Sequence, residues 1–287
     1  MKRREFIKSI STGVAAATVG VGFIPGASAG ILPPPTASHP KFRNSDLSAY
    51  LNKVRQFNED HQGDVFLTDH QFELLGRSLQ RFRRLQRLVG FGNFYLLDFD
   101  DAIRYSQRHT EVGKFSMAEL NFLEMIFYER ATEYGFYGEK PLKNLTDRIP
   151  RREVVKVHST GNYLYKGRPL ELYYKIRKEV GPDVILTSGV RSVIKQFLLF
   201  LDKTYESSGN LSRASRSLAP PGYSFHGISD FDVGQRGYGQ FNFTEKFVTT
   251  DVFKRLKDLG YLTLRYPKDN MLGVRFEPWH IKVHGRA

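Results

Sequence analysis

The sequence contains no cysteine among its 287 residues. Disulfides and cysteine-ligated metal sites are therefore excluded, and an oxidising compartment poses no hazard to the chain. A long apolar run is also missing, because the stretch at residues 10–24 is too short and too interrupted by glycine to span a membrane convincingly. Stability must come from a packed core, for which the chain is long enough.

Acidic residues are scarce relative to basic ones, with 30 Asp and Glu against 43 Lys and Arg and a formal net charge of +13. In the cytoplasm such an excess would suggest nucleic acid. For an exported protein we expect an anionic wall polymer or lipid headgroups instead. Basic side chains that simply face solvent explain the charge equally well. We therefore predict no nucleic-acid partner.

The first 29 residues have the pattern of a cleavable export signal. A basic head with Arg3 and Arg4 precedes the apolar stretch, which ends in small residues at Ala27 and Ala29. The two adjacent arginines resemble the twin-arginine signal, whose cargo crosses the membrane already folded. An ordinary secretory signal and an uncleaved membrane tether are the alternatives. We predict a twin-arginine signal peptide at 1–29, no membrane span after cleavage, and a periplasmic or otherwise exported protein.

Composition and periodicity divide the remaining chain into three parts. Residues 30–44 are rich in proline and predict an extended linker. Residues 45–149 predict a mostly helical region. Apolar residues recur with helical spacing from the start of this region and again after Asp69. A possible capping box of Ser116 and Glu119 would begin a third helix that runs through about Tyr134. This region carries no recognisable chemistry of its own.

Residues 150–287 combine short strands with helices and form the third part. We predict a hairpin near 154–165, a helix at 170–180, a buried strand at 183–188 and a helix at about 192–200, then a polar loop at 207–217, a helix from about 250 to 260, and strand-like runs at 261–264 and 281–284.

Two segments of this part, about 50 residues apart, suggest a metal site. The first contains His226 and Asp232, and the second contains Glu277 and His280 beside the only tryptophan. Zinc enzymes commonly use three protein ligands and leave the fourth position to water. His226, Asp232 and His280 would be the ligands, and Glu277 would remain as the base that takes a proton from water. On a strand, His284 would lie about 13 Å from His280, too far to share the ion.

Four motifs of this part occur in the order of a known family. They are Ser188-Gly189-Val190-Arg191-Ser192 with Gln196, Pro221-Gly222-Tyr223-Ser224-Phe225-His226, Leu264-Arg265-Tyr266-Pro267 and Glu277-Pro278-Trp279-His280. Together they resemble the zinc D-alanyl-D-alanine carboxypeptidases, which share their fold with lysostaphin and the hedgehog signalling domain. The resemblance covers about residues 150–285.

The resemblance implies an α+β fold, in which an antiparallel sheet of the hedgehog and D-Ala-D-Ala-peptidase type is flanked by helices. The mostly helical amino-terminal region precedes it. Further implications are one Zn²⁺ ion per chain, although other divalent ions also suit this ligand set, and hydrolysis of peptidoglycan stem peptides. By matching positions, His226, Asp232 and His280 would bind the metal, and Glu277 would be the catalytic base.

The same matching assigns roles around the substrate. Arg191 would stabilise the oxyanion, for which a permanently charged guanidinium with several donors is well suited. Arg191 and Ser224 would hold the substrate, and Gln196 would either contact it or position its own helix.

One spacing departs from the family. Five residues separate His226 from Asp232, where six are usual, and Asp230 stands where a small residue is expected. On a strand Asp230 and Asp232 would face the same side, so either could reach the metal. We favour Asp232 and expect Asp230 to orient a ligand histidine or to bind a substrate amine.

These features predict an exported zinc metallopeptidase. Removal of the terminal D-alanine is the leading reaction, and an endopeptidase with the same machinery is the alternative. A non-catalytic wall-binding protein is a second alternative, supported only by the shortened spacing. The presence of Glu277 and Arg191 argues against it, because a binding protein needs neither a base nor an oxyanion donor.

Overall fold

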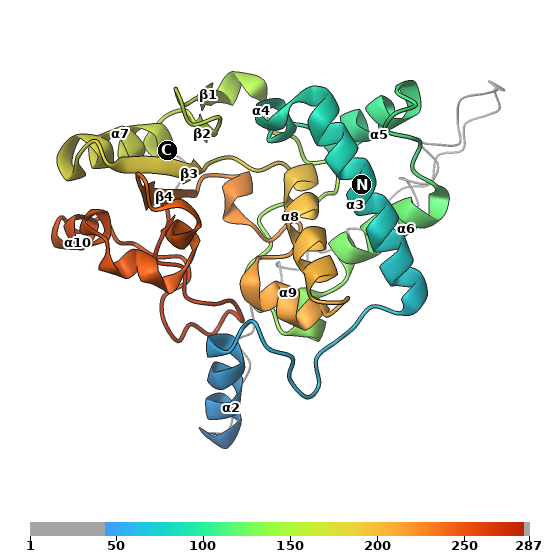
Figure 1. Cartoon of the computed structure of the whole chain (residues 1–287), viewed down its shortest axis with the longest axis horizontal. Coiled ribbons are helices and arrows are strands. Elements are labelled where there is room, and N and C mark those ends of the chain that lie inside the picture. Colours follow the sequence, from blue (N-terminus) through green and yellow to red (C-terminus); the bar gives the residue numbers. More distant parts are fainter. Residues whose placement is uncertain (1–43, 284–287) are drawn as a thin grey trace, which may run out of the picture. The chain divides into compact units, whose positions relative to one another are not determined.

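The computed structural model describes residues 44–283, which belong to one compact unit, His39–Ala287 (Figure 1). The predicted signal peptide, all of the predicted linker except Asn44, and His284 lie outside the described residues. Within the described part, no helix is long and apolar enough to cross a membrane.

The region before residue 150 is helical, as predicted. Its elements are α2 (Asn44–Arg55), α3 (Asp69–Val89), α4 (Phe91–Phe94), α5 (Phe99–Arg108), α6 (Met117–Tyr128) and the 3-10 helix η1 (Ala131–Tyr134). The predicted capping box is present, because Ser116 Oγ accepts from Glu119 N at 3.2 Å and Glu119 Oε2 accepts from Ser116 N at 2.7 Å. Helix α6 ends at Tyr128, so only the short η1 turn reaches the predicted end at Tyr134.

The rest of the chain combines two small antiparallel sheets with helices, which makes the fold α+β as predicted. Strands β1 (Val154–Lys156) and β2 (Tyr163–Tyr165) form the predicted hairpin. Strands β3 (Val184–Ser188), β4 (Phe231–Gln235) and β5 (His280–Ile281) form the second sheet, in that order. The other elements are η2 (Arg151–Glu153), α7 (Arg168–Val180), α8 (Val193–Glu206), α9 (Leu211–Ser217), η3 (Phe225–Gly227), η4 (Gly239–Phe243), η5 (Glu245–Thr249) and α10 (Asp251–Asp258).

Helices α7 and α10 pack against the three-stranded sheet and close one core over it. In β3 every second residue is buried, and Val184 and Leu186 point into this core. Tyr173 of α7 and Leu256 of α10 meet them there, and both side chains are fully buried. The sheet is thereby fixed from one side, and the carboxyl end of β3 leads into the Gly189–Ser192 turn.

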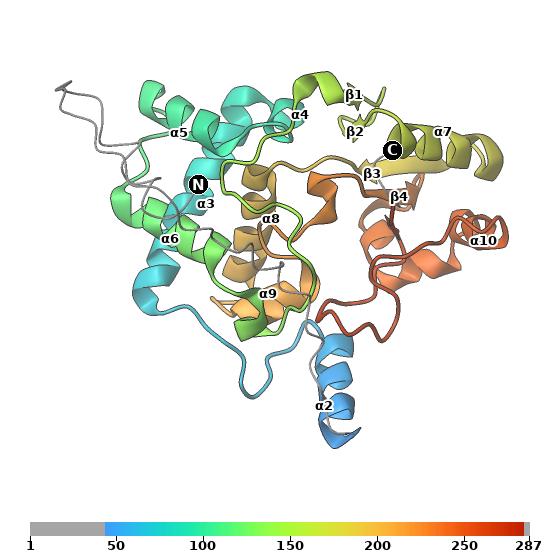
Figure 2. The same ribbon diagram turned by 180° about the vertical axis from the view of Figure 1, so that it is seen from behind.

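The amino-terminal helices pack against the later part of the chain, mainly through α3 on α8, which lie side by side in both views (Figures 1 and 2). The Phe82 ring of α3 stacks on the Phe197 ring of α8 with centroids 6.0 Å apart. The backbone N–H of Ser192, the cap of α8, donates to Tyr95 O at 2.9 Å. These contacts couple the start of α8 to the amino-terminal region. The boundary near residue 150 stays a prediction.

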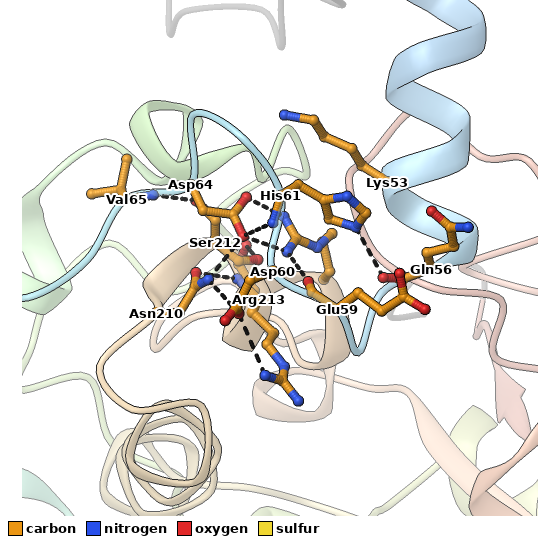
Figure 3. Close-up of polar contacts among 12 residues, drawn as sticks. Lys53, Gln56, Glu59, Asp60, His61, Asp64, Val65, Asn210, Ser212 and Arg213 are labelled. Carbon is orange, nitrogen blue, oxygen red and sulfur yellow. Dashed lines mark hydrogen bonds and ion pairs between the residues drawn. The ribbon is translucent and has the colours of Figure 1, made fainter.

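Two predicted elements are wrong. Residues 211–217 of the predicted loop form α9, which Asn210 caps by accepting from Arg213 N at 2.8 Å. The segment at residues 59–65 stabilises this serine-rich helix, since Val65 N donates to Ser212 Oγ and the Arg216 side chain is held by Asp64 (Figure 3). Tertiary hydrogen bonds thus outweigh weak helix propensity. The predicted strand at 261–264 is reduced to one bridge, between Leu264 and Ile281.

Candidate metal centre

The ends of two neighbouring strands and one 3-10 turn bring the predicted ligands together. Asp232 on β4 lies opposite His280, the first residue of β5, in the antiparallel register. Ser188, the last residue of β3, lies opposite Asp232 on the other side. His226 comes from η3, just before β4. His226, Asp232 and His280 form a buried group whose ligand atoms all lie within 4.8 Å of one another.

His226 is held in one tautomer by the backbone. Its Nδ1 lies 2.7 Å from Gly189 O, and a carbonyl can only accept, so Nδ1 carries the proton and Nε2 is left with a lone pair. A side chain at Gly189 is excluded, because a Cβ there would lie 2.0 Å from Tyr163 O. Burial, followed by the nearby charge of Arg191, lowers the pKa of His226 and favours this neutral form.

His280 uses its two ring nitrogens differently. Its Nε2 donates to Asp230 Oδ2 at 3.0 Å, while Nδ1 lies 3.4 Å from Asp232 Oδ1 and 3.3 Å from Glu277 Oε2. Burial alone would lower the pKa of His280, but the hydrogen bonds to Asp230 and Glu277 and the charge of Asp232 outweigh it and raise the pKa to about 9. The surroundings of this imidazole are therefore strongly anionic.

The cluster fits a tetrahedral cation. His226 Nε2 and Asp232 Oδ1 lie 3.2 Å apart, yet neither of these buried atoms has a hydrogen-bond partner. Such orphaned atoms are costly unless something binds them. Two ligands bonded to one tetrahedral zinc ion would lie about 3.4 Å apart, close to the 3.2 and 3.4 Å from Asp232 Oδ1 to the two histidines. Imidazole nitrogen and carboxylate oxygen are both donors found in zinc sites.

Asp230 faces protein groups rather than the cluster centre. It accepts from Arg265 Nε at 2.8 Å, from His280 Nε2 and from Val283 N at 3.0 Å, and its side chain is fully buried. Although burial opposes it, hydrogen bonds from His280 and Arg265 hold the pKa of Asp230 well below its usual range. Arg265 is itself stacked on the Phe225 ring at 3.4 Å. In this geometry Asp230 orients His280 and has no atom directed to a substrate amine.

Arg191 lies beside the cluster and is anchored at two points. Its Nη2 donates to Asp232 Oδ2 at 2.6 Å, and its Nε donates to Ser188 Oγ at 2.9 Å. Asp232 thus uses Oδ2 for Arg191 and directs Oδ1 at the histidines. Burial would raise the pKa of Asp232, but the charge of the adjacent Arg191 guanidinium holds it below its usual value.

Gln196 ties the surrounding backbone together. Its Oε1 accepts from Gly222 N at 2.8 Å and its Nε2 donates to Arg191 O at 3.0 Å. Ser224 is buried and precedes η3 without capping it by its side chain. Both residues line a pocket of about 20 Å³, the narrow pocket, together with His226, Glu277 and His280. The predicted site residues therefore meet, with Gln196 placed to fix the Arg191 turn.

A second pocket, the wide pocket, of about 290 Å³, shares Arg191 and Glu277 with the narrow one. Its other lining residues include Tyr95, Lys195 and Arg275, which sequence reasoning missed. Arg275 stands two residues before Glu277, so its position was a usable clue. Tyr95 carried no such clue, because it lies in a helical region without a chemical motif.

Tyr266 was also missed as a site residue, although it belongs to one of the quoted motifs. Its ring packs edge-on against His280 with centroids 5.3 Å apart, and it lines the narrow pocket. Burial raises the pKa of its hydroxyl far above the usual range, so Tyr266 stays neutral.

With this geometry in place, the comparison with protein families is decisive for one part of the chain. Residues 169–286 match the VanY family of D-alanyl-D-alanine carboxypeptidases. The VanY match contains all the predicted site residues and agrees with the resemblance for this part of the chain. It leaves out helices α2–α6 and the β1–β2 hairpin.

Solved structures give partial matches to VanY-type enzymes. LdcB LD-carboxypeptidase, in a structure said to reveal the molecular basis of peptidoglycan recognition, is 26% identical, with 43% of this chain and 60% of that chain covered and a TM-score of 0.37. A zinc(II)-bound variant of the D,D-pentapeptidase VanY from a VanB-type resistance cassette is 24% identical, with 50% and 86% covered and a TM-score of 0.38. VanYB in complex with D-alanine-D-alanine is 25% identical, with 50% and 85% covered and a TM-score of 0.38. No curated protein matches.

Proposed function

We propose that the protein is a zinc-dependent peptidase that hydrolyses peptidoglycan stem peptides, with removal of a terminal D-alanine as its main reaction. The observation that carries the proposal is the pair of orphaned, buried atoms His226 Nε2 and Asp232 Oδ1 beside His280 and Glu277. A protein without a metal would leave both atoms unsatisfied at a substantial cost in stability. The VanY match of residues 169–286 supports the substrate class.

His226 Nε2, Asp232 Oδ1 and His280 Nδ1 would hold the ion. Zinc, when bound, would act as a Lewis acid and lower the pKa of a water molecule towards about 7. Glu277 then takes the proton of the attacking water and passes it to the leaving amine. The Arg191 guanidinium, anchored by Ser188 and Asp232, donates to the developing oxyanion without reorganising first.

The narrow pocket supports a small terminal residue. It lies beside Glu277 and His226, and its roughly 20 Å³ is little more than the space that one water molecule needs. A methyl side chain such as that of alanine suits this space, whereas a long side chain does not. Ser224 at its edge would help to hold the terminus.

We further propose that the protein works outside the cytoplasm, after export by the twin-arginine pathway. The basic head, the apolar stretch and the small residues of positions 1–29 support this. Mass spectrometry of protein secreted by its natural host tests it, because processing would give a mature chain that begins near Gly30. A chain that still carries Met1 would contradict it.

The decisive experiment compares wild type with Glu277→Gln on defined muropeptides, a pentapeptide and a cross-linked dimer, followed by mass spectrometry. We expect wild type to release one alanine from the pentapeptide, in a reaction that a chelator abolishes and zinc restores. Glu277→Gln should lose 10²–10⁴-fold in rate, the usual contribution of a general base, and keep its zinc.

Other outcomes would redirect the proposal. Cleavage of only the cross-linked dimer would identify an endopeptidase that uses the same residues. Unchanged hydrolysis in Glu277→Gln would refute the mechanism. Stoichiometric zinc without hydrolysis of either substrate would favour a wall-binding protein.

A further inference from the structure

The wide pocket contains two cations that form no ion pair with another described residue. Lys195 and Arg275 both line it, and within residues 44–283 neither has a carboxylate oxygen within 4.0 Å. The two acidic residues of the pocket are paired, Asp232 with Arg191 and Glu277 with His280, and their charges also act on Arg275. Three cations, Arg191, Lys195 and Arg275, thus face two carboxylates. The pocket therefore offers positive charge beside the reaction centre.

Lys195 is a largely buried cation on the first turn of α8. Its Nζ lies 5.1 Å from the centre of the Tyr95 ring. Burial, and then repulsion from Arg191, lower the pKa of Lys195 to about 8. The carboxylate whose charge acts on it, Asp202, is paired with Arg83. An anion bound in the pocket would raise the pKa of Lys195 again and stabilise its charged form.

Arg275 is held in place by two aromatic rings. Its guanidinium carbon lies 4.8 Å from the centre of the Phe57 ring and 4.9 Å from that of the Trp279 ring. Its Nε is buried and has no hydrogen-bond partner. A guanidinium clamped in this way loses little entropy when it binds a carboxylate, and charge-assisted hydrogen bonds of this kind are among the strong ones.

The two pockets differ in size, so each would suit a different part of a peptide substrate. They share Arg191 and Glu277, beside which the scissile amide would lie, and differ in most of their other lining residues. The narrow pocket has room for a small terminal group only. The wide pocket, at about 290 Å³, has room for a longer side chain.

We propose that Lys195 and Arg275 form an anion subsite that binds a side-chain carboxylate of an acidic peptide substrate and makes acidic peptides better substrates than their amidated forms. The inference rests on the proposed function, since it assigns the substrate class of that site. Tyr95, which lines the pocket, and Phe57, which packs on Arg275, lie before the VanY match at residues 169–286. The amino-terminal region thus contributes to substrate selection.

The test uses zinc-loaded protein and peptides that end in D-Ala-D-Ala and carry either Glu or Gln at one of the three preceding positions. At one position, wild type should hydrolyse the Glu peptide about tenfold better in kcat/KM, which is the size expected for one charge-assisted contact. Lys195→Gln and Arg275→Gln should each reduce this preference to about twofold or less, mainly through KM. Lys254→Gln and Arg77→Gln, matched changes of exposed cations, should leave it unchanged.

Equal hydrolysis of the Glu and Gln peptides at all three positions, or a preference that survives both variants, would overturn the subsite. A second set with a free or amidated carboxyl terminus shows whether the two cations act on the terminal carboxylate instead, which would also overturn it. Lys195→Gln is the safer of the two variants, because Arg275 also contributes packing.

Failure of the proposed function would look different, since wild type would then hydrolyse neither peptide. Calorimetric binding of the same peptides would still test the subsite in that case. Tighter binding of the Glu peptide that both variants lose would support it, and equal binding would refute it.

Discussion

Two buried ionic clusters in this protein differ in which of their polar atoms have hydrogen-bond partners. The first joins the segment before α3 to α9 through Asp64 and Arg216, whose side chains are 3% and 7% exposed. Asp64 lies beside Asn210 in Figure 3. Asp64 Oδ1 accepts from Arg216 Nη1, and Oδ2 accepts from Arg216 Nη2, from Asn210 Nδ2 and from the backbone N–H of His61. Every carboxylate oxygen here has a donor from the protein.

The second cluster, at the ends of β4 and β5, leaves its centre unsatisfied. Asp232 Oδ1 and His226 Nε2 face each other without a hydrogen bond. Around this centre, the outer atoms are bonded: Asp232 Oδ2 to Arg191, His226 Nδ1 to Gly189 O and His280 Nε2 to Asp230. The difference distinguishes a structural ion pair from a candidate cation site. In the first, both oxygens of Asp64 are bonded and the buried atom without a partner is a donor, Arg216 Nε, which cannot bind a cation. In the second, the buried atoms without a partner, His226 Nε2 and Asp232 Oδ1, are both acceptors.

The largest effect that separates the clusters is expected from His226→Gln. The change removes one inward-facing ligand, so zinc binding and hydrolysis should both fall below detection. Zinc should raise the thermal midpoint of wild type, because a ligand that binds only the folded state stabilises it, and this rise should vanish in the variant. Metal analysis after dialysis and thermal unfolding with and without zinc measure both. An unchanged zinc content would show that His226 is no ligand.

The cluster of Asp64 and Arg216 should respond through stability instead. Asp64→Asn removes the charge that pairs with buried Arg216, so the free energy of unfolding should fall by about 3 kcal/mol, the lower end for a broken buried pair. Zinc content and the rise in thermal midpoint with zinc should stay as in wild type. Denaturant unfolding of the zinc-free proteins gives the free energies.

Acid provides the control for Asp64. Burial opposes ionisation, but hydrogen bonds from Arg216 and Asn210 hold the pKa of Asp64 well below its ordinary value. A carboxyl whose pKa is lowered by folding contributes stability above its unfolded pKa, about 3.9, and loses that contribution as pH falls. The difference between wild type and Asp64→Asn should therefore be full at pH 6 and shrink below pH 4. A difference that is independent of pH would mean that packing, not charge, is lost.

The sequence predicted the metal cluster better than its surroundings. His226, Asp232 and His280 stand in short motifs whose order along the chain is itself informative. The two-residue spacing of Asp230 and Asp232 indicated that both carboxylates would lie close to the predicted metal. The wide pocket was not predictable, because Tyr95 and Phe57 reach Lys195 and Arg275 from about 100 or more residues away. Helix α9 was missed for a related reason. Its serines have weak helix propensity, and the hydrogen bond that stabilises it joins Arg216 to Asp64, a residue 152 positions earlier in the sequence.

The smallest of these effects is expected at Asp230, at the edge of the cluster of His226, Asp232 and His280. Asp230→Asn keeps the size of the side chain but removes the charge that orients His280 through Nε2. Removing such an outer partner commonly costs 10–100-fold in metal affinity, so zinc should bind more weakly while the stoichiometry at saturation stays at one. Competition with a chromophoric chelator measures the affinity, and Asp251→Asn, on an exposed carboxylate of α10, is the matched control. If Asp230 were itself the ligand in place of Asp232, the variant would lose its zinc altogether, and Asp232→Asn would be the milder change. The order of the two variants therefore decides between the two carboxylates that the shortened spacing leaves open.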